Sequence, residues 1–191
     1  MATAITTREF DRIREFLQRE TSISLTDDKA YLVETRLSEI MKAHGLSDYG
    51  ALSMALQANL PRGLRDLVID AMTTNETLWF RDVAPFDAFR DHLLPAWAGE
   101  IAAGKRQKVR IWSAACSTGQ EPYSLSMLYH EASRRFPSLR PENLDILATD
   151  LSDSSLATAR AGIYGGMAIQ RGLPDSYLER YFTPGADGRH E

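Results

Sequence analysis

The chain has 191 residues and a formal net charge of −4, with 43% hydrophobic and 25% charged residues. This balance is typical of a globular protein rather than a disordered one. No apolar run approaches the ~20 residues of a membrane span, and the first residues lack the pattern of a secretory signal. The composition therefore predicts a soluble, cytoplasmic protein without membrane insertion. The negative net charge argues against nucleic acid as a partner.

The single cysteine, Cys116, cannot form an internal disulfide, which suits a reducing compartment. Its place in a turn raises the alternative of a nucleophile, but no histidine lies nearby in the sequence and a small apolar thiol suits a tight turn. The histidines are far apart and lack the spacing of metal ligands, so no metal site is predicted. They are His44, His92, His130 and His190.

Residues 6–72 show helical periodicity in four short segments, which predicts an all-α amino-terminal domain over residues 1–72. The first helix begins with a capping box, in which Thr6 and Glu9 satisfy each other's backbone groups. Its apolar residues recur at helical spacing and predict one buried stripe. They are Phe10, Ile13, Phe16 and Leu17.

The next three helices are marked by their caps. The second runs from about Asp28 to His44, and Gly45 ends it. Ser47 is expected to cap the third helix and Pro61 to start the fourth. The predicted core residues of these helices are Val33, Leu37, Ile40, Met41, Leu52, Leu56, Leu64, Leu67, Val68 and Ala71.

Residues 73–84 are predicted to form a hinge between two parts of the chain. Their threonines and asparagine are unfavourable inside a helix but suit turns and caps. Trp79 and Phe80 then precede Arg81. This aromatic pair has two equally supported interpretations: it walls an adenosyl or methionyl group, or it plugs the core beside an interdomain linker.

A tight turn between a strand and a helix is the most informative feature of the chain. A helix from Pro85 to about Ala98 and a solvated basic turn from Lys105 to Lys108 lead into a strand at Val109–Trp112. Seven small residues follow, Ser113–Gly119, and Pro122 is expected to open a helix. Such a turn lets a ligand lie against bare backbone, with the N–H groups of the helix start aimed at it. The pattern predicts the ligand-binding corner of an α/β nucleotide fold.

The turn carries a carboxylate rather than a cation. It lacks the glycine spacing of dinucleotide enzymes and the Gly-Lys-Ser/Thr of a phosphate loop. No Lys or Arg falls between Ile111 and Tyr123, whereas Glu121 lies at the helix start. A carboxylate suits a ligand with an ammonium group or sugar hydroxyls. The alternative is structural, because Thr118 and Glu121 have the spacing of a capping box.

A second strand, Leu144–Asp150, ends on an acid. In open α/β sheets, ligands bind outside the carboxyl ends of strands, and an acid there accepts hydrogen bonds from both ribose hydroxyls. Asp150 is placed to do so. The alternative is that Asp150 or Ser152 caps the next helix, Ser154 to Ala161.

Three motifs together resemble the CheR family of chemotaxis receptor methyltransferases. They are Ser113–Ser124, Ala148–Ser152 and Thr73–Arg81. The resemblance begins in the amino-terminal helices and continues to Tyr181-Phe182, so it covers nearly the whole chain. The family more often has Gly where Ala115 stands and Glu where Gln120 stands. Because alanine favours a negative φ, Ala115 weakens the case for close approach of the ligand to the backbone.

The resemblance implies a fold, a reaction and a set of site residues. The implied fold class is α + α/β: the helical domain is followed by a Rossmann-like methyltransferase domain over residues 85–191. The implied reaction transfers a methyl group from S-adenosylmethionine to glutamate side chains of chemoreceptors, leaving S-adenosylhomocysteine. The implied cofactor contacts come from the covering segment 73–84 and from both strand ends. They are Asn75, Thr77, Arg81, Glu121 and Asp150.

Methyl transfer of this kind needs no general base, because a glutamate side chain is already ionised at neutral pH. The enzyme must align the acceptor oxygen with the methyl carbon and sulfur. Arg81 is the candidate catalytic residue, since a guanidinium holds a carboxylate with two hydrogen bonds. The alternative is that Arg81 pairs with a structural acid such as Asp82 or Glu121.

Two expectations concern completeness and partners. A parallel sheet needs more than the two strands predicted here, so the methyltransferase domain is expected to be truncated. Two alternatives to a chemoreceptor methyltransferase stay open. One is a methyltransferase that acts on another carboxylate, and the other, which truncation favours, is a non-catalytic module that binds cofactor or receptor. Acidic receptor helices call for a basic face, which Lys29, Arg36 and Lys42 offer on the second helix. The alternative is a solvated helix face.

Overall fold

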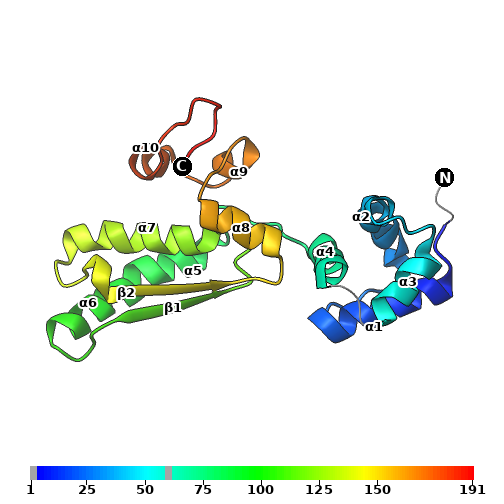
Figure 1. Cartoon of the computed structure of the whole chain (residues 1–191). Helices are drawn as coiled ribbons and strands as arrows, with labels where there is room; N and C mark the ends of the chain where they lie inside the picture. The colour runs from blue at the N-terminus through cyan, green and yellow to red at the C-terminus, as the bar shows by residue number, and fades with distance from the viewer. Residues whose placement is uncertain (1–3, 59–61) are drawn as a thin grey trace. The chain divides into compact units, whose positions relative to one another are not determined.

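The computed structural model describes residues 4–58 and 62–191. The chain forms two compact units (Figure 1): Met1–Thr74 with Leu151–Asp153, and Asn75–Asp150 with Ser154–Glu191. The first unit is helical and the second combines helices with a small parallel sheet, which is the predicted fold class. In the part of the chain described, no helix is long and apolar enough to cross a membrane.

The first unit contains the four predicted helices. Thr6 caps α1, and the Thr6 side chain and Glu9 make the predicted capping box. The predicted stripe of α1 is fully buried, because its spacing places all four side chains on one face of the helix. The helices are α1 (Thr7–Thr21), α2 (Ala30–Ala43), α3 (Tyr49–Gln57) and α4 (Arg62–Met72).

Three details of this unit differ from the predictions. A short 3₁₀ turn precedes α2, which therefore starts at Ala30. The cap of α3 is Asp48 rather than Ser47, because the Asp48 carboxylate accepts the Ala51 N–H at 2.7 Å while the Ser47 hydroxyl donates to Asp48. Leu67 is 44% exposed, since the buried face of α4 follows Leu64, Val68 and Met72 with Ile69 beside them. The predicted start at Pro61 lies outside the described residues.

Arg36 has a structural role in this unit. Its Nη1 donates to three carbonyl oxygens at the end of α4, those of Ala71, Met72 and Thr73, at 3.2–3.4 Å. These are carbonyls that a helix end leaves without an intrahelical partner. Arg36 is therefore half-buried and holds the end of α4 to α2.

The second unit is built around a crossover in which strand β1 (Val109–Ala114) is connected through a helix, α7, to strand β2 (Leu144–Thr149). The predicted helix before the first strand is observed as an almost continuous helical run with one π turn at Phe89–Leu93. The helices are α5 (Val83–Ala88), α6 (Leu94–Ala102), α7 (Gln120–Arg135), α8 (Asp153–Ala161), α9 (Met167–Gln170) and α10 (Asp175–Tyr181).

The strands β1 (Val109–Ala114) and β2 (Leu144–Thr149) pair in parallel, with Val109 opposite Leu144. One sheet face packs on α5, α6 and α7, and in Figure 1 α7 runs along one side of the strands. On the other face, Trp112 is 69% and Leu147 is 61% exposed. Parallel strands place their carboxyl ends at the same edge, so the residues after β1 and β2 meet there.

Candidate functional site

The turn after β1 is tied to the end of β2 by two hydrogen bonds. The Cys116 N–H donates to the Thr149 carbonyl at 3.0 Å, and the Ser117 N–H donates to the Asp150 carboxylate at 2.7 Å. Within the turn, the Gly119 N–H donates to the Cys116 carbonyl at 3.0 Å. The predicted strand–turn–helix corner is therefore present, and Asp150 is part of its framework.

Left-handed backbone conformations alternate along this turn. Ala115 has φ of 59°, Ser117 has 49° and Gly119 has 97°. The expectation that Ala115 takes a negative φ is wrong. The Cys116 and Ser117 N–H groups, directly after Ala115, are held by Thr149 and Asp150, and these two hydrogen bonds outweigh a conformational cost of ~1–2 kcal/mol for a residue with a Cβ.

Ala115→Gly should stabilise the second unit. Glycine adopts positive φ without steric cost, so we expect the free energy of unfolding to rise by up to ~1 kcal/mol in spite of the added entropy of the unfolded chain. Urea unfolding of both proteins measures the change. Ala114→Gly, at the neighbouring β1 position, is the control and should destabilise. A loss of stability in Ala115→Gly would contradict the strained turn.

The helix after the turn begins at Gln120, two residues earlier than predicted, with Gly119 as its N-cap. The capping-box alternative for Thr118 and Glu121 is wrong. The Thr118 hydroxyl donates to the Gln120 side chain at 2.7 Å. Glu121 instead accepts the Ser113 hydroxyl at 2.7 Å, which places its carboxylate beside the end of β1.

Two carboxylates thus lie at the carboxyl ends of neighbouring parallel strands, one held by the end of β1 and the other by the turn. Glu121 is fixed through Ser113 and Asp150 through Ser117. Carboxylates only accept hydrogen bonds, whereas an ammonium group and ribose hydroxyls can donate them. This acceptor chemistry fits a ligand such as S-adenosylmethionine, which carries both kinds of donor.

The hinge residues reach the same turn. The Ser117 hydroxyl donates to the Asn75 carbonyl at 2.9 Å. Asn75 and Thr77 also line a cavity of about 230 Å³ with Thr118 and Gln120. The structure therefore brings four of the five predicted cofactor residues around one turn. The remaining cavity residues are Glu76, Met167, Ala168 and Arg171.

Trp79 is a core residue, as one of the two interpretations had it. Its side chain is fully buried, and its indole N–H donates to the Ala168 carbonyl at 2.8 Å. The Trp79 ring packs edge-on against Tyr164 and Phe182, at centroid distances of 5.0 and 5.4 Å. Phe80 is anchored by its N–H, which donates to the Ser124 hydroxyl at 3.1 Å. Trp79 is therefore closed off from a ligand, and both residues anchor the segment.

Arg81 is less closely connected to the turn. Its Nη1 donates to the Glu76 carbonyl at 2.9 Å, and its Nε lies 3.9 Å from the Asp82 carboxylate. The side chain is 56% exposed, so that ion pair contributes little. Arg81 is not among the residues lining the 230 Å³ cavity. The hydrogen bond to Glu76 nevertheless curls the segment and orients the guanidinium.

Cys116 does not have the environment of a nucleophile. Burial raises the pKa of its thiol, and the charges of Asp150 and Glu121 raise this pKa further. The thiolate is the nucleophilic form of cysteine, so these surroundings suppress reactivity. The interpretation of Cys116 as a small buried residue of the turn is supported.

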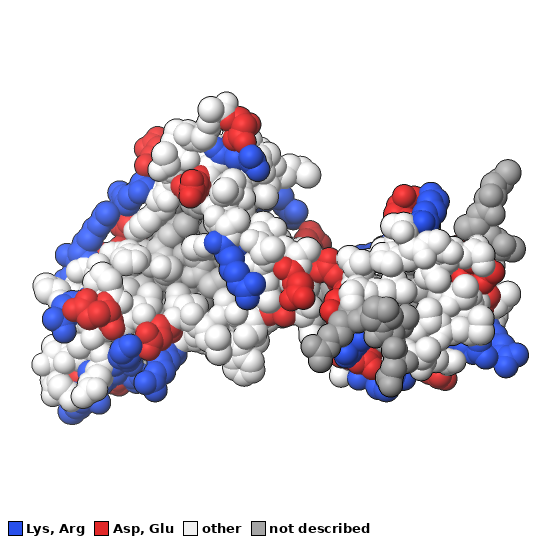
Figure 2. Space-filling model, in the orientation of Figure 1, with Lys and Arg blue, Asp and Glu red and all other residues white. Residues whose placement is uncertain are grey.

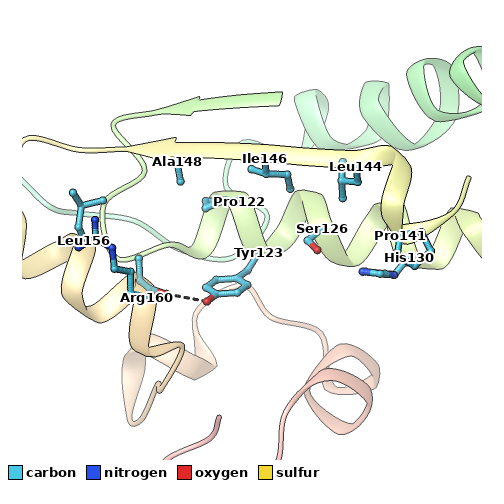
Figure 3. A pocket seen from close by; sticks show the side chains of 11 residues that line it. Pro122, Tyr123, Ser126, His130, Pro141, Leu144, Ile146, Ala148, Leu156 and Arg160 are labelled. Atoms are coloured by element: carbon cyan, nitrogen blue, oxygen red, sulfur yellow. Dashed lines mark hydrogen bonds between the residues drawn. The ribbon is translucent and has the colours of Figure 1, made fainter. Parts of the chain in front are cut away.

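A larger cavity, of about 480 Å³, lies elsewhere in the second unit (Figure 3). The β2 side chains Leu144, Ile146 and Ala148 form one side of it, and α7 and α8 form the others. The Tyr123 hydroxyl donates to the Ala159 carbonyl at its border. None of the predicted cofactor residues lines this cavity, so it is not the candidate site.

Tyr164 is a residue of the site that sequence reasoning missed. It is buried, and its hydroxyl donates to the Thr118 carbonyl at 2.6 Å. The two residues are 46 positions apart, and neither belongs to a pattern that links them. No signal in a single sequence predicts this contact.

Comparison with known proteins agrees with this geometry. Residues 75–191 match the family described as "CheR methyltransferase, SAM binding domain", and residues 8–73 match "CheR methyltransferase, all-alpha domain". By this description the second unit corresponds to the S-adenosylmethionine-binding domain of that family, and S-adenosylmethionine is the predicted methyl donor.

Curated relatives carry the same kind of name. "Chemotaxis protein methyltransferase Cher2" of Pseudomonas putida is 43% identical over 95% of this chain and 65% of its own length. "Chemotaxis protein methyltransferase 1" of Pseudomonas aeruginosa is 45% identical over the same shares. "Chemotaxis protein methyltransferase" of Vibrio parahaemolyticus is 44% identical over 98% of this chain and 66% of its own. The chain thus spans about two thirds of the length of these relatives, and it belongs to the CheR methyltransferase family.

Proposed function

We propose that this protein is a protein-glutamate O-methyltransferase that acts on chemoreceptors in the cytoplasm. The observation that carries the proposal is the pair of carboxylates at the ends of β1 and β2, joined by one turn. When bound, S-adenosylmethionine supplies an activated methyl group. An O–CH₃ bond to the acceptor glutamate forms as the CH₃–S bond breaks, so the sulfonium becomes a neutral thioether and the carboxylate an ester.

The residues around the turn bind and orient the cofactor in this proposal. Asp150 accepts hydrogen bonds from the ribose hydroxyls, and Glu121 accepts them from the ammonium group. Asn75 and Thr77 cover the bound molecule, supported by the Ser117–Asn75 hydrogen bond that holds their segment against the turn.

Arg81 is proposed to contact the cofactor and to orient the acceptor carboxylate. A guanidinium offers two parallel N–H donors to a carboxylate. Its hydrogen bond to the Glu76 carbonyl holds the guanidinium near the backbone of the covering segment, which supports this role. Proton transfer plays no part, because the acceptor is already ionised at neutral pH.

A methyl-transfer assay tests the proposed function. The protein is incubated with S-adenosylmethionine carrying a radioactive methyl group and with a chemoreceptor cytoplasmic domain. We expect label on the receptor that mild base releases as methanol, and none on a receptor whose acceptor glutamates are replaced by alanine. Label on small carboxylates alone would favour a different methyltransferase. Cofactor binding without transfer would favour a non-catalytic module.

Docking of acidic receptor helices is proposed to use Lys29 and Lys42 of the second-helix region. Each lysine already pairs with a neighbouring acid: Lys29 lies 3.2 Å from Asp28, and Lys42 lies 2.5 Å from Glu39. Figure 2 likewise shows acidic and basic side chains interspersed on the visible face rather than one basic patch. Arg36, the third predicted basic residue, holds the end of α4. Replacing it would lower stability as well as charge, so a slower reaction of that variant would not report docking alone.

We expect Lys29→Glu with Lys42→Glu to slow receptor methylation through slower association. The defect should shrink as salt rises, because exposed charges are screened within ~10 Å at 0.1 M ionic strength. Affinity for S-adenosylhomocysteine should not change. Lys105→Glu with Lys108→Glu, which replaces two exposed lysines of the second unit, is the charge-matched control. Parental methylation rates in low salt for the double variant would count against docking through these lysines.

A further inference from the structure

The Tyr164 side chain is held at one position beside the candidate cofactor turn. Its ring packs edge-on against Trp79 at 5.0 Å and against Phe182 at 6.3 Å. Its backbone pairs with His190, with N–H···O distances of 2.8 and 2.7 Å. A buried ring fixed on several sides cannot redirect its hydroxyl by more than a small rotation.

The Thr118 carbonyl needs a donor from outside its own helix. Thr118 precedes the N-cap Gly119, whose φ of 97° turns the chain away from helical geometry. The residue four positions on is Pro122, which has no N–H to donate. A backbone carbonyl near the protein interior costs free energy if it lacks a partner. The Tyr164 hydroxyl supplies the hydrogen bond at 2.6 Å.

Gly119 shows how closely the hydroxyl approaches the turn. A Cβ at this position would lie 2.9 Å from the Tyr164 hydroxyl oxygen. The hydroxyl therefore lies close to Gly119 as well as bonding to the Thr118 carbonyl. Burial raises the pKa of Tyr164 above its ordinary value, so the hydroxyl remains a donor at any physiological pH.

We propose that Tyr164 is a positioning residue for the cofactor turn. Its hydroxyl fixes the orientation of the Thr118–Gly119 peptide, which sets the direction in which α7 starts. Glu121 lies in the first turn of α7, so its carboxylate takes its place beside β1 through the same peptide. The effect on cofactor binding rests on the proposed function, whereas the effect on the turn does not.

Tyr164→Phe tests the proposal against Tyr129→Phe. Tyr129 is also fully buried, and its hydroxyl donates to the Arg140 carbonyl at 3.1 Å, away from the turn. Both variants lose one buried tyrosine–carbonyl hydrogen bond and keep the aromatic ring. In the ligand-free protein, we expect amide hydrogen exchange over residues 115–121 to accelerate in Tyr164→Phe only. We expect the Kd for S-adenosylhomocysteine to rise up to about tenfold in this variant alone, as for loss of one neutral hydrogen bond.

The outcomes separate this proposal from the proposed function. Faster exchange in the turn without measurable binding by the parent protein would keep the positioning role and reject the cofactor. Equal exchange in the two variants, or parental exchange over residues 115–121 in Tyr164→Phe, would overturn the positioning role. Parental Kd in Tyr164→Phe, with binding by the parent established, would also overturn it.

Discussion

Asp150→Ala is expected to weaken binding of S-adenosylhomocysteine by about 2–4 kcal/mol, because hydrogen bonds to a charged acceptor are worth ~1.5–3 kcal/mol each. The variant loses the proposed bonds to the ribose and also the acceptor of the Ser117 N–H. Calorimetric titration of ligand into each protein measures the change in affinity. Urea unfolding reports the smaller loss of stability that follows from loosening the turn.

Asp145→Ala is the matched control for this experiment. Asp145 lies on β2, the strand that Asp150 directly follows, is exposed, and pairs with Lys108 at 3.0 Å away from the turn. Its removal should change neither the affinity nor, beyond a few tenths of a kcal/mol, the stability. If Asp150→Ala binds the ligand as tightly as the parent, Asp150 has only the structural role that its contact with Ser117 describes.

Gly119→Ala is expected to lower the free energy of unfolding by about 3 kcal/mol. An alanine at φ of 97° is strained, which accounts for ~1–2 kcal/mol. Its Cβ would also lie 2.9 Å from the Ala159 Cβ and from the Tyr164 hydroxyl, where overpacking adds ~1–3 kcal/mol. Urea unfolding gives the stability, and its denaturant slope shows whether the transition stays cooperative.

Gly104→Ala separates the two contributions. Gly104 has φ of 70°, but nothing lies within 4 Å of the Cβ that alanine would add. This control should lose only the ~1–2 kcal/mol of backbone strain. Equal losses in the two variants would mean that the space around Gly119 relaxes, contrary to the close packing against Tyr164.

Local chemistry explains which parts of the fold were predictable. The α1 capping box depends on two residues three positions apart, Thr6 and Glu9. The positions at which β1 and β2 end were predictable because a hydrophobic run stops there, at small residues after β1 and at an acid after β2. Because parallel strands align their carboxyl ends, the sequence predicted that Glu121 and Asp150 would gather at one turn.

The predictions that were wrong, left open or missed concern features that tertiary contacts decide. Ala115 takes a positive φ because Thr149 and Asp150 hold the turn from another strand. The interpretation of Trp79 stayed open because its partner, Ala168, lies 89 residues away. Tyr164 was missed for the same reason. A single sequence encodes these contacts without a periodic or spacing signal that reveals them.

Arg81 and the covering segment remain predictions. Their local conformation follows from the hydrogen bond between Arg81 and the Glu76 carbonyl. Their contact with a ligand depends on the bound molecule, which the sequence pattern alone does not place.

Titration of S-adenosylhomocysteine into the protein by calorimetry tests the central claim most directly, because this product carries the same ammonium group and ribose as the cofactor. The turn and its two carboxylates predict saturable binding to one site per chain. Glu121→Gln should weaken that binding, since it removes the charge held beside β1 by Ser113. The absence of saturable binding by a protein that unfolds cooperatively in urea would contradict the claim.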